Sequence, residues 1–324
     1  MSLEVTPDGK QLRVSWLQEP HVSVFDLEWL RYNSYNPPLR KAKERPQLLW
    51  RADDLVQNLP VVPYAEVMED DNLLKTCLLQ IETFGISFID GIPSTVEATD
   101  ALARRITFVR ETHYGQTHLI SADLAHGDAA FMPVHLPAHA DTCYFTDSVG
   151  LLMMHVLHHT GGTGGESTFV DGFAVAEHLK REHQWAYKVL TKVPVSFHSA
   201  GDEETLVEPI HASSILREHP LTGKLLQIRH NNEDRSVLRE VDPHDVSAFY
   251  AALKLWTGLL KDPVFEYRIK MPRGCAAMVD NWRVLHGRTA FTGSRVIAAS
   301  YLNRDDYKSR VKTLLDGNVS KRFL

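Results

Sequence analysis

The sequence is poor in cysteine and has no long hydrophobic run. Its 324 residues include three cysteines, Cys77, Cys143 and Cys275, which are too few for a disulfide scaffold and too scattered for a cysteine zinc site. No apolar stretch approaches the roughly 20 residues that a membrane-spanning helix requires. The first residues, Met1 to Gln11, show the pattern of neither a signal peptide nor a transit peptide, so we expect a cytoplasmic protein without a membrane partner.

The sequence also lacks any cluster of basic residues. Its 35 basic and 41 acidic residues give a net charge of -6, which does not favour a nucleic-acid partner. Hydrophobic residues make up 44% and charged residues 23%, as in an ordinary soluble enzyme. By contrast, the 17 histidines are numerous, and histidine is the commonest metal ligand. The histidine content therefore favours a metal site.

The order of the expected elements predicts a mainly β fold with flanking helices. Residues 1–60 are expected to form a small β-rich domain, and residues 61–324 the main domain. Expected helices cover 64–84, 94–106 (with Ser94 as N-cap), 173–190 and 246–260. Expected strands cover 85–89, 149–158, 167–170, 194–198, 225–230, 264–270, 275–279 and 295–302. Short strands with helices in long insertions favour a double-stranded β-helix, the jelly-roll barrel.

Two His-x-Asp triplets are present, and their contexts differ. His126-Gly127-Asp128 lies in a run of small residues that indicates a loop. His139-Ala140-Asp141 stands directly before a strand-like segment, Thr142 to Phe145. Because residues i and i+2 of a strand share a face, His139 and Asp141 can point together into a barrel. The second triplet is therefore the candidate metal site.

A third ligand comes from far along the chain. His286 follows an expected buried strand, and Arg295 opens the next strand nine residues later, at the same barrel mouth. Two histidines and one carboxylate are the ligands of non-haem Fe(II) oxygenases, and a guanidinium can bind a carboxylate co-substrate through two hydrogen bonds. A single buried histidine is usually structural, and an arginine on a strand is usually a surface charge. The interpretation therefore depends on all four residues together.

Three segments resemble one family of Fe(II)/2-oxoglutarate oxygenases. His139–Phe145, Gly161–Phe173 and Val279–Gly293 resemble the trimethyllysine dioxygenase and γ-butyrobetaine dioxygenase family, within a likeness that runs from about Arg104 to Asp306. The resemblance implies a jelly-roll domain that uses Fe(II), 2-oxoglutarate and O2 to hydroxylate an unactivated C–H bond of a free amino acid, with trimethyllysine the first candidate. It also implies a homodimer and stimulation by ascorbate.

The resemblance assigns roles by position. It implies that iron binds to His139, Asp141 and His286. It implies that 2-oxoglutarate binds to Arg288, Arg295 and Ser167. The amino-acid end of the substrate would contact Asp128 and Asn231, so the first triplet would hold substrate and not iron. The trimethylammonium end would be surrounded by Tyr114, His118, Phe131 and Tyr301.

The chain departs from the family in two places. Relatives often hold zinc through cysteines in the N-terminal unit, but no cysteine precedes Cys77, so we predict no zinc. Phe131 stands where a tyrosine is usual, and His118 where a tryptophan is usual. A neutral imidazole is a poorer partner for a cation than tryptophan. Another α-amino acid or a betaine-like molecule is therefore an alternative substrate.

Two other classes of function compete with an oxygenase. A non-catalytic jelly-roll module could bind a metal through the same three ligands, but it would have no use for the arginines that bind 2-oxoglutarate. A zinc hydrolase is not favoured, since no glutamate general base accompanies a helical pair of histidines.

Overall fold

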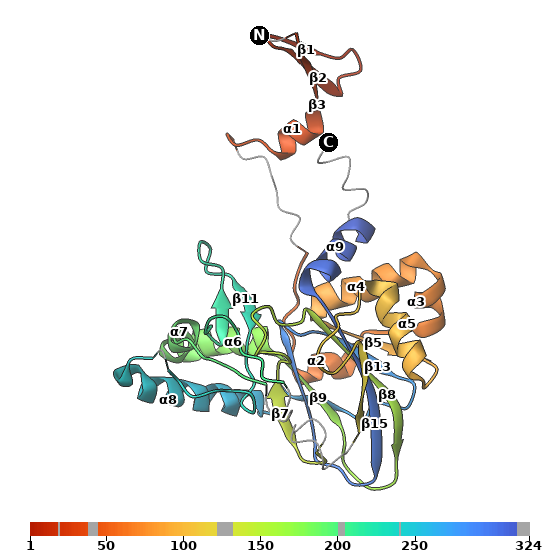
Figure 1. Cartoon of the computed structure of the whole chain (residues 1–324), viewed down its shortest axis with the longest axis vertical. Helices are drawn as coiled ribbons and strands as arrows, with labels where there is room; N and C mark the ends of the chain where they lie inside the picture. The colour runs from red at the N-terminus through yellow and green to blue at the C-terminus, as the bar shows by residue number, and fades with distance from the viewer. Residues whose placement is uncertain (19, 38–44, 122–131, 200–204, 240, 316–324) are drawn as a thin grey trace. The chain divides into compact units, whose positions relative to one another are not determined.

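The computed structural model describes every residue except 19, 38–44, 122–131, 200–204, 240 and 316–324 (Figure 1). The chain divides into two compact units, Met1–Pro46 with Lys312–Leu324, and Gln47–Val311. The first unit holds an antiparallel sheet of β1 (Ser2–Val5), β2 (Gln11–Ser15) and β3 (Val22–Asp26), followed by α1 (Leu27–Tyr32). The small domain predicted for residues 1–60 stays a prediction.

The second unit is built from two main sheets. The larger sheet has six strands, in the spatial order β4 (Val61–Pro63), β5 (Ile86–Asp90), β13 (Ala276–Asp280), β8 (Leu151–Thr160), β15 (Ser294–Leu302) and β6 (Thr117–Ser121). The smaller sheet has the order β12 (Tyr267–Ile269), β9 (Ser167–Asp171), β14 (Val284–Arg288) and β7 (Leu136–His139). Every neighbouring pair in these two sheets is antiparallel except β4 and β5.

The two sheets pack face to face around an apolar core. Phe88 of β5 and Phe169 of β9 meet edge to face, with ring centroids 5.6 Å apart. Val156, Val284 and Ile297 extend this core between the sheets. The prediction of a mainly β protein with helices is confirmed, and the two facing antiparallel sheets are consistent with a jelly roll.

Helices cover the outer faces of both sheets (Figure 1). The helices α6 (Gly172–Glu182), α7 (Gln184–Lys192) and α8 (Pro243–Leu260) share a core with the outward side chains of the four-stranded sheet. The helices α3 (Tyr64–Glu69), α4 (Asp71–Phe84) and α5 (Val96–Ile106) lie beside the six-stranded sheet. The remaining elements are α2 (Ala52–Gln57), the hairpin of β10 (Leu216–Glu218) and β11 (Leu225–Ile228), and α9 (Arg304–Leu315). None of the described helices combines the length and the apolar character needed to cross a bilayer.

Local capping explains where the predicted helices differ from the observed ones. The single helix expected over 64–84 is two helices, because Asp70 caps α4 by accepting a hydrogen bond from the amide of Asn72. The helix expected over 173–190 is likewise divided, at His183. Thr95, and not Ser94, caps α5 through the amide of Ala98. The predicted start of α8 at Asp242 is confirmed, since its side chain accepts from the amide of His244.

The local sequence pattern does not decide the strands that were wrong or missed. Residues 194–198 form isolated bridges through Val195 and Phe197 and no strand. The strands β6, β7 and β14 were not expected from the sequence. In β14 the residues Val-Leu-His-Gly-Arg pair with β7 on one side and β9 on the other, so the hydrogen-bonding neighbours and not local propensity determine the strand.

A buried ion pair joins the four-stranded sheet to two distant segments. The Arg283 guanidinium donates to both Asp171 carboxylate oxygens, at 3.1 and 2.7 Å, and both side chains are almost fully buried, with exposures of 1% and 0%. Arg283 also donates to the carbonyls of Thr83 (2.8 Å) and Leu48 (2.6 Å). The same carboxylate caps α6 through the amide of Phe173. The pair therefore ties β9 and α6 to the end of α4 and to the segment before α2.

We predict that Arg283→Met lowers the free energy of unfolding by about 3–5 kcal/mol, because it leaves the Asp171 carboxylate buried without a cation. Urea unfolding followed by circular dichroism measures the change. The control is Arg181→Met, which removes an exposed guanidinium paired with Glu182 and should leave the midpoint unchanged. Equal midpoints for the two variants would contradict this account of the buried pair.

Candidate active site

Alternate residues of the strands point into the space between the sheets. On β14, Val284, His286 and Arg288 share the inner face, because side chains alternate along a strand. The same rule places Arg295 and Tyr301 on the inner face of β15. Val284 lies in the apolar core, whereas the other four residues line a cavity at the end of the interior. The fold therefore brings residues from both sheets to one hollow.

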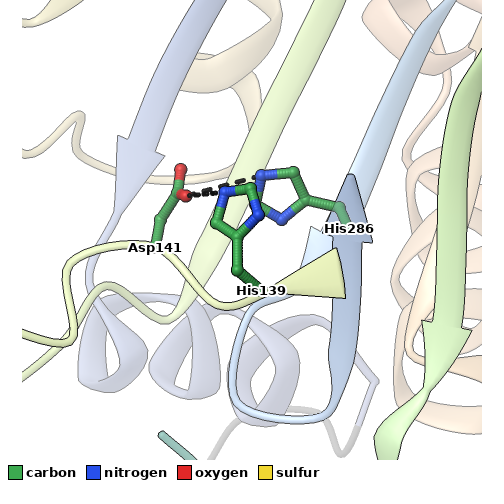
Figure 2. A group of neighbouring side chains, drawn as sticks. All are labelled: His139, Asp141 and His286. Carbon is green, nitrogen blue, oxygen red and sulfur yellow. Dashed lines mark ion pairs between the residues drawn. The ribbon is translucent and has the colours of Figure 1, made fainter. Parts of the chain in front are cut away.

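His139, Asp141 and His286 converge at the wall of this cavity (Figure 2). The Oδ1 atom of Asp141 lies 3.2 Å from Nε2 of His139 and 3.4 Å from Nε2 of His286. The two imidazole centroids are 4.3 Å apart. His139 and His286 occupy paired positions on β7 and β14, so strand register accounts for the closeness of the two rings. One ligand atom from each residue lies within 4.8 Å of the others.

Hydrogen bonds of His139 and Asp141 orient the free atoms of these two side chains toward Nε2 of His286. Nδ1 of His139 lies 2.8 Å from the carbonyl of Pro137, to which it can donate, and this leaves the lone pair of Nε2 available. The hydroxyl of Tyr301 donates to Oδ2 of Asp141 at 2.8 Å, which leaves Oδ1 facing the two imidazoles. Each of the three residues therefore presents one electron-pair donor to a common point.

Burial and charge set the protonation of the group. Burial lowers the pKa of His286 to about 4, so its imidazole is neutral at physiological pH and can donate a lone pair. Burial alone would raise the pKa of Asp141, but His286, His139 and the Tyr301 hydroxyl outweigh it and hold that pKa well below its usual range. Burial opposes and Asp141 favours the protonated form of His139, whose pKa is raised by the carboxylate. A metal cation at this point would replace that proton.

The expectation that His139 and Asp141 both lie on one strand is wrong. The strand β7 ends at His139, and Asp141 begins a turn that replaces the strand expected over 142–145. Thr142 has φ = 56°, a conformation that β-branched residues rarely adopt. Asn281 holds the turn by accepting from the Asp141 amide at 2.8 Å and donating to the Asp141 carbonyl at 3.0 Å. These long-range hydrogen bonds favour a turn over continued pairing.

Two arginines and a serine form another part of the cavity wall. The structure places the predicted residues Arg288, Arg295 and Ser167 there. Burial lowers the pKa of both guanidinium groups to about 10, which leaves them charged at neutral pH. Arg288 donates to the carbonyls of Met132 and Val134 (3.2 Å for the latter). In the described part of the chain, the Arg295 guanidinium makes neither an ion pair nor a hydrogen bond, so a cation is available to an anionic ligand.

Aromatic rings form the opposite part of the wall. The His118 ring lies between Tyr114 and Tyr301, with centroid distances of 5.2 and 5.4 Å, and all three residues line the cavity. Tyr144 also lines it, and its hydroxyl donates to that of Tyr114 at 3.4 Å. Tyr144 was not among the predicted site residues, although it lies in the His139–Phe145 segment that carried the resemblance.

Asn231 also lines the cavity, beside an acidic side chain. Its amide Nδ2 donates to Asp234 at 2.7 Å, and its Oδ1 accepts from the amide of Glu233 at 3.0 Å. Asn231, Glu233 and Asp234 together give this wall polar and acidic groups. The other predicted substrate residues, Asp128 and Phe131, lie outside the described residues, as does the whole His126-Gly127-Asp128 triplet.

The donor set fits a non-haem iron ion. Two imidazole nitrogens and one carboxylate oxygen that face a cavity are the ligands of the iron sites that keep coordination positions open for other ligands. Within the described ranges, no other group of three or more histidine, cysteine or acidic side chains could share a metal. The ligand types exclude a cysteine-based structural zinc at this point.

Comparison with known proteins agrees with this geometry. Residues 47–301 match the taurine catabolism dioxygenase TauD, TfdA family. A trimethyllysine dioxygenase from Meyerozyma guilliermondii is 35% identical over 325 residues, which cover 96% of this chain and 81% of that protein. The mitochondrial trimethyllysine dioxygenase of Homo sapiens is 36% identical, with 95% and 73% of the two chains covered. The γ-butyrobetaine dioxygenase of a Pseudomonas species is 31% identical, with 95% and 79% covered.

Solved structures share the fold at low sequence identity. PvcB from Pseudomonas aeruginosa superposes with a TM-score of 0.52 and 18% identity, covering 73% of this chain and 81% of PvcB. A taurine dioxygenase from Burkholderia xenovorans gives 0.50 and 16%, with 74% and 81% covered. The matched residues, the curated relatives and the shared fold lead to one conclusion: the chain belongs to the taurine catabolism dioxygenase TauD, TfdA family and is a homologue of the trimethyllysine dioxygenases.

Proposed function

We propose that the chain is an Fe(II)- and 2-oxoglutarate-dependent dioxygenase that hydroxylates an unactivated C–H bond of a free amino acid, with trimethyllysine as the substrate. The observation that carries the proposal is the convergence of Nε2 of His139, Nε2 of His286 and Oδ1 of Asp141 beside a cavity that also holds the available cation of Arg295. The likeness to trimethyllysine dioxygenases over 95% or more of the chain supports the substrate class.

Each group in the cavity has a role in this reaction. His139, Asp141 and His286 hold the iron, which with 2-oxoglutarate and O2 supplies the oxidising power that attack on a C–H bond requires. Arg295 binds the distal carboxylate of 2-oxoglutarate, while Arg288 and Ser167 complete that end of the cavity. Tyr301 fixes the unused oxygen of Asp141 and contributes a ring to the substrate pocket. The reaction releases succinate and CO2 with the hydroxylated amino acid.

The substrate would lie between the polar wall and the rings. Asn231 hydrogen-bonds the amino-acid end, together with Asp128. Tyr114, His118 and Tyr301, with Phe131, surround the other end. The tyrosine rings favour a cationic tail. The same arrangement explains why a non-catalytic metal-binding module is the weaker interpretation, since such a module would not need the available cation of Arg295.

His118 favours a second candidate substrate of the same class. Its ring is buried between Tyr114 and Tyr301, so its charge acts directly on the tail of a bound molecule. A protonated His118 would repel a trimethylammonium group and favour an amide or carboxylate tail. Another α-amino acid or a betaine-like molecule is therefore the alternative to trimethyllysine.

The proposal includes the wider properties implied by the resemblance. These are a jelly-roll oxygenase domain over residues 61–324, a small β-rich domain over 1–60 without zinc, a homodimer, stimulation by ascorbate and a cytoplasmic location. Gel filtration with light scattering would test the dimer.

Removal of one iron ligand should abolish turnover without unfolding the protein, because strand pairing and the apolar core hold the framework. The protein is incubated with Fe(II), 2-oxoglutarate and trimethyllysine. Succinate and the mass gain of one oxygen atom in the amino acid are then measured. We expect equal amounts of succinate and hydroxylated product from the wild type, and neither from His139→Ala, Asp141→Ala or His286→Ala. Full consumption of 2-oxoglutarate by His286→Ala would exclude the proposed iron site.

Arg295→Lys should chiefly weaken binding of 2-oxoglutarate. A guanidinium that can grip a carboxylate through two hydrogen bonds becomes a point charge, at a cost of about 1.5–3 kcal/mol for one lost charge-assisted hydrogen bond. The apparent KM for 2-oxoglutarate should therefore rise by roughly tenfold or more. Arg268→Lys is the matched control, because Arg268 lies on β12 and pairs with Glu266 outside the cavity lining. An unchanged KM in Arg295→Lys would mean that a different cation binds the co-substrate.

His118→Trp should raise turnover of trimethyllysine relative to any native amino-acid substrate. Tryptophan is the strongest ring partner for a cation, and it cannot become protonated as imidazole can. Competition assays with trimethyllysine and norleucine, an amino acid whose tail carries no charge, are read by mass spectrometry and give the ratio of the two products. A ratio equal to that of the wild type would show that position 118 does not determine the preference for a cationic tail.

A further inference from the structure

Arg229 is a buried cation that contacts one short turn. Arg229 directly follows β11 in the sequence, and it is only 2% exposed. The guanidinium donates hydrogen bonds to the main-chain carbonyls of Cys143, Phe145 (2.7 Å) and Thr146 (3.1 Å). In the part of the chain that the structure describes, it makes no ion pair with a carboxylate. These carbonyls therefore supply the solvation that burial removes from the cation.

The contacted turn is the one that carries Asp141. It begins directly after β7 and passes through Thr142, whose positive φ is unusual for a β-branched residue. Such a conformation persists only where surrounding groups hold it. Asn281 makes two hydrogen bonds to the main chain of Asp141. Arg229 donates to carbonyls later in the turn, those of Cys143 and Phe145. The two polar residues thus hold opposite ends of the turn.

The main chain next to Arg229 also makes a hydrogen bond to the segment that carries Asp141. The carbonyl of His230 accepts from the amide of Ala140 at 2.8 Å, and Ala140 lies between His139 and Asp141. The next residue, Asn231, lines the cavity. Residues 229–231 therefore contact the chain before and after Asp141 and also border the proposed substrate pocket.

We propose that Arg229 is a positioning residue for the metal site. It holds the turn in the conformation in which Oδ1 of Asp141 meets the two imidazoles, and in which Tyr144 of the same turn lies at the cavity wall. This inference rests on the proposed function, since it assumes that the three ligands hold Fe(II). It assigns a role to a residue that touches neither the ligand side chains nor the cavity.

Loss of Arg229 should affect the metal and spare the co-substrate. Without the guanidinium, the three carbonyls lose their donor, and the turn can relax toward a more common conformation that moves the Asp141 carboxylate. Substitution of residues that orient ligands typically weakens metal binding by about 10–100-fold. Arg295 lies on β15, which Arg229 does not contact, so the 2-oxoglutarate end of the cavity should keep its geometry.

The test compares Arg229→Met and Arg229→Lys with the wild type by anaerobic calorimetry with Fe(II). We expect the Kd for Fe(II) to rise by about tenfold or more in Arg229→Met. Arg229→Lys should show a smaller rise, because a lysine ammonium can still donate to some of the carbonyls. At saturating Fe(II), the KM for 2-oxoglutarate should equal that of the wild type in both variants. A rise in the Kd for Fe(II) without a rise in the KM for 2-oxoglutarate separates a positioning role from general loss of structure.

Arg217→Met is the matched control, because Arg217 lies on the same hairpin and its guanidinium donates to Gln227 and not to the turn. Its Kd for Fe(II) should stay at the wild-type value. Wild-type affinity in both Arg229 variants would overturn the inference, as would a parallel rise in the KM for 2-oxoglutarate. If Arg229→Met does not fold, the Kd of Arg229→Lys for Fe(II) tests the inference. A wild-type Kd in that variant would then overturn it. A wild type that does not bind Fe(II) would overturn the proposed function, and this inference with it.

Discussion

The candidate active site depends on one constraint, which is the burial of the Asp141 carboxylate at the point where two imidazoles converge. The Asp141 carboxylate lies against two imidazoles and the Tyr301 hydroxyl, and these neighbours hold its pKa below the usual range although burial alone would raise it. An ionised buried group is costly unless charge or hydrogen bonds compensate it. Here one oxygen accepts from the hydroxyl, and the other faces the Nε2 atoms of two imidazoles. A divalent metal ion at the point where these atoms converge would compensate the charge of the carboxylate.

The rest of the fold brings the three ligands to that point. The pairing of β7 with β14 fixes the two imidazoles, while the turn after β7 carries Asp141 toward them. The inner faces of β14 and β15 then add Arg288, Arg295 and Tyr301 to the same cavity. Alternation along β14 and β15 thus places His286, two arginines and a tyrosine ring at one cavity, whereas Asp141 reaches it from a turn. The buried pair of Arg283 and Asp171 stabilises the neighbouring part of the small sheet.

The sequence predicted the elements with strong apolar patterns better than the elements of the site. The largely apolar strand β8 and the Asp242 cap of α8 could be predicted, because local residues determine them. The strand β14 could not, since Gly287 and His286 give it no β signal and its two neighbouring strands hold it. The turn at Asp141 depends on Asn281, which lies 140 residues later. The residues that line the cavity were largely selected by resemblance, whereas the role of Arg229 has no signal in the sequence.

The central claim is that three side chains hold one Fe(II) ion and leave a side open for 2-oxoglutarate. An anaerobic titration with Fe(II), with and without 2-oxoglutarate, tests it most directly through the visible charge-transfer absorption that the two form when 2-oxoglutarate chelates the iron. The account predicts saturation at one iron per chain, with the band present only when both components are bound. A protein that binds 2-oxoglutarate equally well without metal, or that saturates with iron and 2-oxoglutarate without the band, would contradict it.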